Sequence, residues 1–112
     1  MDSILTSIKK LLGITEDYNY FDPDIIMHIN TAMMTLTQIG VGPSEGFVIE
    51  DETATWGDFV QDTPNFRVDW VKSYIYLKVR LLFDPPLNQG AKDAIVNCIS
   101  ELEFRLNVAA ES

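Results

Sequence analysis

Two side chains of this chain could act as a nucleophile or a proton-transfer base near neutral pH, and each residue type occurs once. His28 lies in a segment with helical spacing over residues 22–40, and Cys98 lies in another over residues 88–106. A Ser-His-acid or Cys-His set needs its members within hydrogen-bonding reach. A lone histidine without a second histidine or spaced carboxylates is a poor metal site. We therefore expect no catalytic or metal role for His28, and we expect Cys98 to be a small core residue.

The glycines and carboxylates do not form a ligand-binding motif either. Gly40, Gly42 and Gly46 do not precede a Lys-Ser or Lys-Thr pair, which a phosphate-binding loop requires. The acidic run at residues 50–52 lacks the alternating oxygen ligands, the bend glycine and the distal glutamate of a calcium loop. No carboxylate pair has a spacing that marks acid–base catalysis. The sequence therefore predicts a protein that is not an enzyme and that binds no metal or cofactor.

The charge of the chain is strongly negative and unevenly distributed. Seventeen acidic and eight basic residues give a net charge of −9, which argues against a protein that wraps nucleic acid. Residues 11–66 contain no Lys or Arg and carry ten acidic residues, among them Glu50, Asp51 and Glu52. One interpretation is solubility. The other is a surface that faces a basic partner, or DNA that the protein must not bind.

The length and the cysteine content bound the architecture and the compartment. A chain of 112 residues suits one domain, spanning residues 1–112, with a core that needs no metal or disulfide. The single Cys98 excludes an internal disulfide. The first residues do not resemble a signal peptide, because the lysines follow the apolar residues. We expect a protein kept in a reducing, soluble compartment without a membrane segment.

The apolar stretch over residues 66–84 predicts a central helix. Trp70, Tyr74, Leu77 and Leu81 fall on one side at 100° per residue, with Val71, Ile75 and Leu82 beside them. A helix that is apolar over most of its circumference is packed from several sides. Pro85 and Pro86 predict an end at Phe83 or Asp84. On this assignment Leu81→Ala would cost about 2–5 kcal/mol of unfolding free energy.

The other segments predict a small all-α bundle of four to five helices around this central one. A first helix ends before Gly13, and a second begins with Asp22 as N-cap and Pro23. Between them and the central helix lies a long acidic loop over residues 43–65. This loop can hold a short extended piece at residues 46–49 and a short helix capped by Thr55. The last helix follows Asn88, and its apolar stripe is Ala91, Ile95, Cys98, Ile99, Leu102 and Leu106.

Two features of the last helices concern charged and exposed side chains. Lys78 projects from the apolar surface of the central helix, so we expect it to reach water or a carboxylate, with Glu103 as the candidate. Phe104 and Val108 lie on the far side of the last helix from its stripe. An apolar pair on an outer face indicates contact with another chain.

Six runs of this sequence occur together, in the same order, in one known family of proteins, and they cover nearly the whole chain: residues 41–43, 46–47, 55–56, 58–59, 70–86 and 101–106. They resemble the head–tail connector, or adaptor, proteins of tailed bacteriophages and prophages. The most specific is the Phe83-Asp84-Pro85-Pro86 ending of a long aromatic helix. The resemblance implies a role in the fold or in assembly for these positions: Trp70, Tyr74, Phe83, Asp84, Pro85, Pro86 and residues 101–106.

The resemblance implies a helical adaptor without catalytic residues or cofactors. Such adaptors assemble as a dodecamer-like ring beneath the portal, between the capsid and the tail, and the ring surrounds the DNA channel. The implied partners are further copies of the chain, the portal, and head-closure or tail proteins, and DNA passes without specific binding. The implied location is the virion neck, after synthesis in the bacterial host cytoplasm. In such adaptors the C-terminal helix helps to dock onto the portal. Four residues follow Val108 here, so we do not expect a long C-terminal docking tail.

A closed ring needs two different contact patches on each subunit. Phe104 and Val108 are candidates for one patch. Either the loop residues Phe47, Val48 and Ile49 or the aromatic connection Tyr18, Tyr20 and Phe21 are candidates for the other. Glu50, Asp51 and Glu52 are candidates for a channel lining that repels DNA. The alternatives are another neck component, such as a head-closure or tail-completion protein, and a small helical partner-binding regulator.

Overall fold

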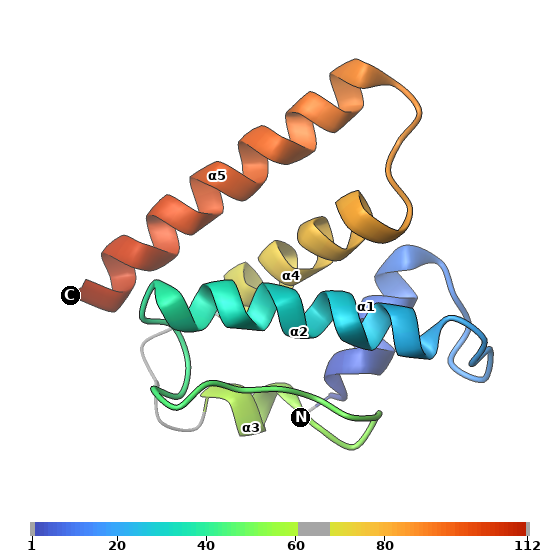
Figure 1. The fold of residues 1–112 in the computed structure, drawn as a ribbon, viewed down its shortest axis with the longest axis horizontal. Coiled ribbons are helices and arrows are strands. Elements are labelled where there is room, and N and C mark those ends of the chain that lie inside the picture. Colours follow the sequence, from blue (N-terminus) through green and yellow to red (C-terminus); the bar gives the residue numbers. More distant parts are fainter. Residues whose placement is uncertain (1, 61–67, 112) are drawn as a thin grey trace.

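The fold is a bundle of helices arranged around α4 (Figure 1). The computed structural model describes residues 2–60 and 68–111. Within these ranges the helices are α1 (Ile4–Leu12), α2 (Asp22–Gln38), α3 (Trp56–Val60), α4 (Val68–Phe83) and α5 (Gln89–Glu111). The same ranges contain no strand, only an isolated bridge between Ser3 and Thr55. The all-α prediction is therefore confirmed.

The helix ends lie where the capping residues predict them. Ser3 caps α1 by accepting a hydrogen bond from the Thr6 amide at 3.2 Å, and Gly13 ends the helix with φ at +83°. Asn88 caps α5 by accepting from the Ala91 amide at 3.0 Å. α4 ends at Phe83, directly before the turn at residues 84–86, as predicted. The predicted start of α4 near residue 66 and the breaker at residues 62–65 lie outside the described residues.

The start of α2 differs from the prediction, because Asp22 is not its N-cap. Asp22 is the first residue of the helix, and its side chain makes no capping hydrogen bond. Its Oδ1 atom instead lies 2.9 Å from Nζ of Lys9, which is only 2 % exposed. Lys9 also donates to the carbonyl of Glu16 at 3.0 Å. A buried ammonium needs such partners, and this pair ties the end of α1 to the beginning of α2.

The buried face of α4 is rotated from the predicted one. α4 packs chiefly against α2, then against α5 and α1. Its fully buried residues are Val71, Tyr74, Ile75 and Val79. Trp70, Leu77 and Leu81 are only half-buried. The prediction centred the core on the flank of Trp70, Leu77 and Leu81, whereas the flank of Val71, Ile75 and Val79 is buried more completely.

Leu82 does not belong to the core, although its position on α4 matches that of Val71 and Ile75. Its side chain is 52 % exposed. Because it lies in the last turn, this exposure means that the neighbouring helices no longer cover that flank there. Phe83, on the other side of the turn, is half-buried and packs edge-on against Phe21 at 5.2 Å.

Tyr74, rather than Lys78, is the partner of Glu103. The Tyr74 hydroxyl donates to Oε2 of Glu103 at 2.6 Å and joins α4 to α5. Burial of the Tyr74 ring, and then the neighbouring Glu103 carboxylate, raise the pKa of the Tyr74 hydroxyl above its ordinary value of 10.0. The Lys78 ammonium lies over the Tyr74 ring, 5.9 Å from its centre. The predicted pairing of Lys78 with Glu103 is therefore wrong.

α5 buries a narrower strip than its apolar stripe predicts. Ile99 and Leu106 are buried, whereas Ala91, Ile95 and Leu102 are half-buried. Cys98 is exposed, so its prediction as a core residue is wrong. It lies at the edge of the stripe, and the contact with α4 does not extend that far. The side chain of Asn107 donates to the carbonyl of Ile39 at 3.2 Å, which fixes the second half of α5 on the end of α2.

The loop between α2 and α3 follows α2 (Figure 1), and residues 46–49, where a short extended piece could form, are not a strand. The side chain of Asn30 takes the place of a strand partner. Its Oδ1 accepts from the backbone N–H of Ile49 at 2.8 Å, and its Nδ2 donates to the backbone carbonyl of Ile49 at 3.0 Å. The predicted short helix is present as α3. Its capping box is reciprocal: Asp58 accepts from the Thr55 amide at 3.0 Å, and Thr55 accepts from the Asp58 amide at 3.2 Å.

The burial pattern of α4 predicts which of its residues stabilise the fold. Ile75→Ala removes a fully buried side chain, and we expect it to lower the free energy of unfolding by about 2–5 kcal/mol. Leu82→Ala is the matched control, with an expected loss of about 0.5–1 kcal/mol. Leu81→Ala should fall between them rather than reach the full core value. Urea unfolding measures all three, and equal losses for Ile75→Ala and Leu82→Ala would contradict this packing.

The Tyr74–Glu103 hydrogen bond predicts a pH dependence of stability at alkaline pH. The pKa of Tyr74 is raised in the folded state, so its contribution is complete below the ordinary tyrosine pKa of about 10 and decreases as pH rises above it. Tyr74→Phe should cost about 1–3 kcal/mol at pH 7, because Glu103 loses its donor. The variant should also lose less stability than the wild type above about pH 10. If the free energies of unfolding of the wild type and of Tyr74→Phe change in parallel across pH 7–11, the role of this hydrogen bond is refuted.

Candidate assembly interface

The described residues do not bring together groups for catalysis or metal binding. His28 is half-buried on α2 and Cys98 is exposed on α5. Across residues 2–60 and 68–111, no cluster of three or more His, Cys, Asp or Glu side chains could hold a metal ion. No helix in the same ranges has the length and apolarity to cross a membrane. The notable feature of the surface is its exposed apolar side chains, and these form separate patches.

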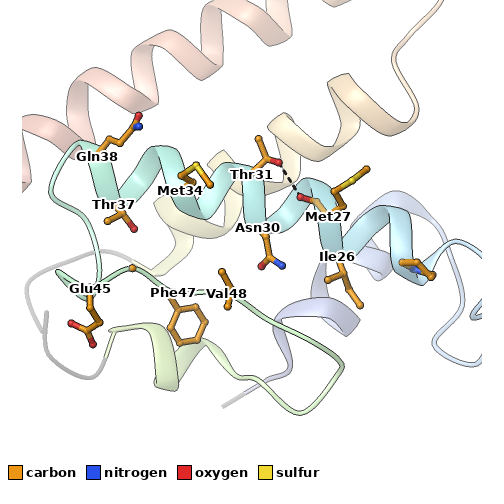
Figure 2. A pocket seen from close by; sticks show the side chains of 12 residues that line it. Ile26, Met27, Asn30, Thr31, Met34, Thr37, Gln38, Glu45, Phe47 and Val48 are labelled. Carbon is orange, nitrogen blue, oxygen red and sulfur yellow. Dashed lines mark hydrogen bonds between the residues drawn. The ribbon is translucent and has the colours of Figure 1, made fainter.

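The first patch is a groove between α2 and residues 45–48, which we call the α2 groove (Figure 2). It encloses about 800 Å³. Its apolar lining comes from side chains on α2 and from the loop that faces them: Pro23, Ile26, Met27, Met34, Phe47 and Val48. Met34 and Val48 are 65 % and 67 % exposed. Such a patch of flexible thioethers and aliphatic groups is suited to contact with another protein.

Local structure explains why this groove stays open. Asn30 holds the Ile49 backbone close to α2, while the preceding residues 45–48 stand away from the helix (Figure 2). Phe47 is half-buried and packs edge-on against Phe59 at 5.4 Å. The Phe59 ring in turn lies against Gly42, where a Cβ atom would come within 2.6 Å of it. Gly42 also has φ at +87°, so the loop conformation depends on a glycine at this position.

The three loop residues predicted as contacts occupy different environments. Val48 is exposed and Phe47 is half-buried, and both line the α2 groove. Ile49 is buried in the core and does not reach the surface. The prediction that Ile49 contacts another subunit does not fit this burial. Met27 and Met34 of α2 also line the groove. Spacing alone could have suggested this, since both lie off the buried stripe of α2.

The second patch is formed by Phe104 and Val108 on the outer face of α5, and we call it the α5 ridge. Phe104 is 70 % exposed, and Val108 is also exposed. Both border a shallow depression of about 530 Å³ that reaches the half-buried Trp70 of α4. Arg105, beside Phe104, forms an ion pair with Glu101, with Nη2 and Oε1 2.9 Å apart. The sequence placed Phe104 and Val108 on an outer face, and the structure has them there.

A third apolar surface lies near the turn between α4 and α5. Asp84 and Pro85 are exposed, and Pro86 is half-buried. The Asp84 amide donates to the Arg80 carbonyl at 3.0 Å, which completes the last turn of α4. The side chains of Leu82 and Leu87 are exposed here.

In the connection between α1 and α2, the Tyr20 ring packs edge-on against Phe21, which contacts Phe83. Tyr18 also lies against Phe21.

The described acidic residues between α2 and α3 are exposed to solvent. Among them, Glu50, Asp51 and Glu52 closely follow the loop residues that line the α2 groove. Asp51 accepts hydrogen bonds from the amide and the hydroxyl of Thr53, at 2.9 and 2.5 Å. These hydrogen bonds lower the pKa of Asp51 below its ordinary value of 3.8. The carboxylate of Asp51 therefore stays ionised at any physiological pH.

Comparison with known proteins identifies the family. Comparisons with curated proteins and with solved structures give no significant match. A family model described as "Phage connector protein" matches residues 4–112, which is nearly the whole chain. The match includes all five helices described above, the α2 groove, the α5 ridge and the turn after Phe83. It agrees with the resemblance that the sequence shows to head–tail connectors, and the chain belongs to the phage connector protein family.

Proposed function

We propose that this protein is a non-enzymatic structural subunit of the phage neck, and that it forms a ring between the portal and the tail. The observation that carries this proposal is the presence of two different exposed apolar patches, the α2 groove and the α5 ridge, which share no residue. Two different patches on one subunit allow head-to-tail contacts, and such contacts close into a ring when the rotation per subunit permits. Family membership supports the same role.

The proposed partners are other copies of the chain, the portal, and the head-closure or tail proteins. The ring in this proposal is dodecamer-like and part of the virion, and its subunits are made in the host cytoplasm. The two patches supply the contacts between subunits. The turn at residues 84–87 and the exposed Tyr20 leave a third apolar surface for a neighbouring neck protein.

We also propose that the acidic loop faces the DNA channel of the ring. Glu50, Asp51 and Glu52 are exposed, and no Lys or Arg occurs within residues 11–66. A negative lining repels the phosphate backbone, so DNA can pass through without being held. In this position the residues would act by charge alone and would read no sequence.

Among the alternatives, a head-closure or tail-completion protein has less support, because such proteins are richer in strands and the described part of this chain has none. A small helical regulator would act as a monomer or dimer. Electron microscopy of the protein mixed with purified portal distinguishes these functions. A ring stacked on the portal supports the connector, whereas a protein that stays monomeric or dimeric in the presence of portal supports the regulator.

Phe104 provides a direct test of assembly against folding. We expect Phe104→Asp to abolish ring formation on the portal, because it puts a charge on an apolar contact. Its effect on the free energy of unfolding of the monomer should be within about 0.5 kcal/mol, because the side chain is largely exposed. Asn97→Asp is the matched control, since Asn97 is exposed on the same face of α5, about two turns away. If Phe104→Asp assembles normally, or if it unfolds the monomer, the proposed contact is wrong.

The acidic loop provides a separate test. We expect the triple variant Glu50→Gln, Asp51→Asn and Glu52→Gln to assemble normally, because these side chains are exposed and Asn at 51 can still accept from Thr53. Its rings should retain more DNA than wild-type rings in a filter-binding assay at low salt, and the difference should decrease as salt rises. An image of the assembled ring with these three residues on the outer rim would exclude the channel role.

A further inference from the structure

We infer that the α2 groove of one subunit receives the α5 ridge of the next, with Phe104 and Val108 inserted between α2 and residues 45–48. This inference rests on the proposed ring and names the two surfaces that form each contact between subunits. The groove is concave and lined mainly by apolar side chains, and the ridge presents an exposed aromatic ring beside an exposed valine. Figure 2 shows Met34, Phe47 and Val48 at the positions where such a ridge would enter.

The groove has the size for these side chains. Its volume of about 800 Å³ lies in the range of sites that enclose a whole small ligand, about 300–1,000 Å³. One aromatic and one branched aliphatic side chain therefore fit without opening the fold. Met27 and Met34 can change rotamers to follow the shape of the entering ring, because the methionine side chain is unbranched and flexible.

The ridge cannot reach the groove of its own chain. Leu106 is fully buried against the bundle, and Phe104 precedes it by two residues, which is about 200° around the helix. Asn107 fixes the same part of α5 to the end of α2 through the Ile39 carbonyl. Phe104 therefore points away from the bundle, and the α2 groove lies between α2 and the loop on the side away from α5 (Figure 1). Only another copy can bring the two together.

Charge favours this pairing over contact between two like surfaces. The described residues 11–60, which include the whole lining of the groove, carry nine acidic and no basic residues, a net charge of −9. Residues 68–111, which carry the ridge, contain six acidic and five basic residues, a net charge of −1. Groove-to-groove contact would oppose two strongly negative surfaces, whereas groove-to-ridge contact opposes a negative surface and a nearly neutral one. Arg105 beside the ridge and Glu45 in the groove also have complementary charges.

Cysteine cross-linking tests this pairing on rings assembled with purified portal. In a Cys98→Ser background, which removes the one native thiol, Val48→Cys places a thiol in the groove and Val108→Cys places one on the ridge. Both side chains are exposed, so both variants should fold. A short thiol-reactive cross-linker is then added to each single variant, to an equal mixture of the two, and to the double variant.

The expected pattern follows from a head-to-tail contact. Each single variant alone should give no cross-link, the mixture should give a covalent dimer and nothing larger, and the double variant should give a ladder of oligomers. Asn97→Cys is the control for the ridge, since it lies on the same face of α5 about 16 Å from Val108. A mixture of Asn97→Cys and Val48→Cys subunits should give no covalent dimer.

The other outcomes separate the two proposals. If Val108→Cys alone forms a dimer, the ridge contacts itself, and the inference is wrong. If electron microscopy shows rings but the mixture gives no dimer, the subunits meet through other surfaces, and only this inference fails. If no ring forms on the portal with the wild-type chain, the proposed function fails, and the inference fails with it.

Discussion

The structure depends on covering both flanks of α4 with the few helices that a chain of this length provides. On one flank Val71, Ile75 and Val79 are all fully buried, and α2 is the main packing partner of α4. α5 covers the opposite flank, and there the fixed point is the hydrogen bond from Tyr74 to Glu103. A hydrogen bond to a carboxylate in a partly buried site is stronger and more directional than apolar contact. It therefore sets the rotation of α5 on α4, and with it the face of α5 that is left outside.

The rotation of α5 explains why the molecule exposes so much apolar surface. α5 has 23 residues, and only Ile99 and Leu106 among them are buried. A helix with so narrow a buried strip gains little from its own bundle, and the side chain of its outer Phe104 is 70 % exposed. The same holds for α2, whose buried stripe leaves Met27 and Met34 outside. Exposed apolar patches of this kind mark interaction sites, so in the proposed ring these two helices use one face for folding and another for assembly.

The sequence predicted the parts of the fold that local chemistry controls and missed those that depend on packing angles. Ser3, Gly13, the Thr55–Asp58 capping box and the end of α4 at Phe83 were predictable, because caps and prolines act within a turn of the backbone. The exposure of Cys98 and Leu82 was not predictable, because it depends on how far a neighbouring helix extends. The burial of Ile49 was not predictable either, because it depends on the Asn30 side chain that holds the loop against α2. The burial of Lys9 was also not predictable, because no periodicity links it to its partners Asp22 and Glu16. For the assembly residues, Phe104 and Val108 were predictable from their angle on α5, whereas the α2 groove required the path of the loop.

Charge and apolar surface together explain how such a subunit could stay separate until it is needed. In the proposed ring each contact inserts only a few side chains, while every copy carries a net charge of −9. Long-range repulsion between copies then opposes a weak short-range attraction, so free subunits gain little by associating. A portal that binds several copies side by side raises their effective concentration, and the second contact becomes intramolecular. The acidic middle of the chain would therefore serve twice, first against premature association and then, if it lines the channel, against retention of DNA.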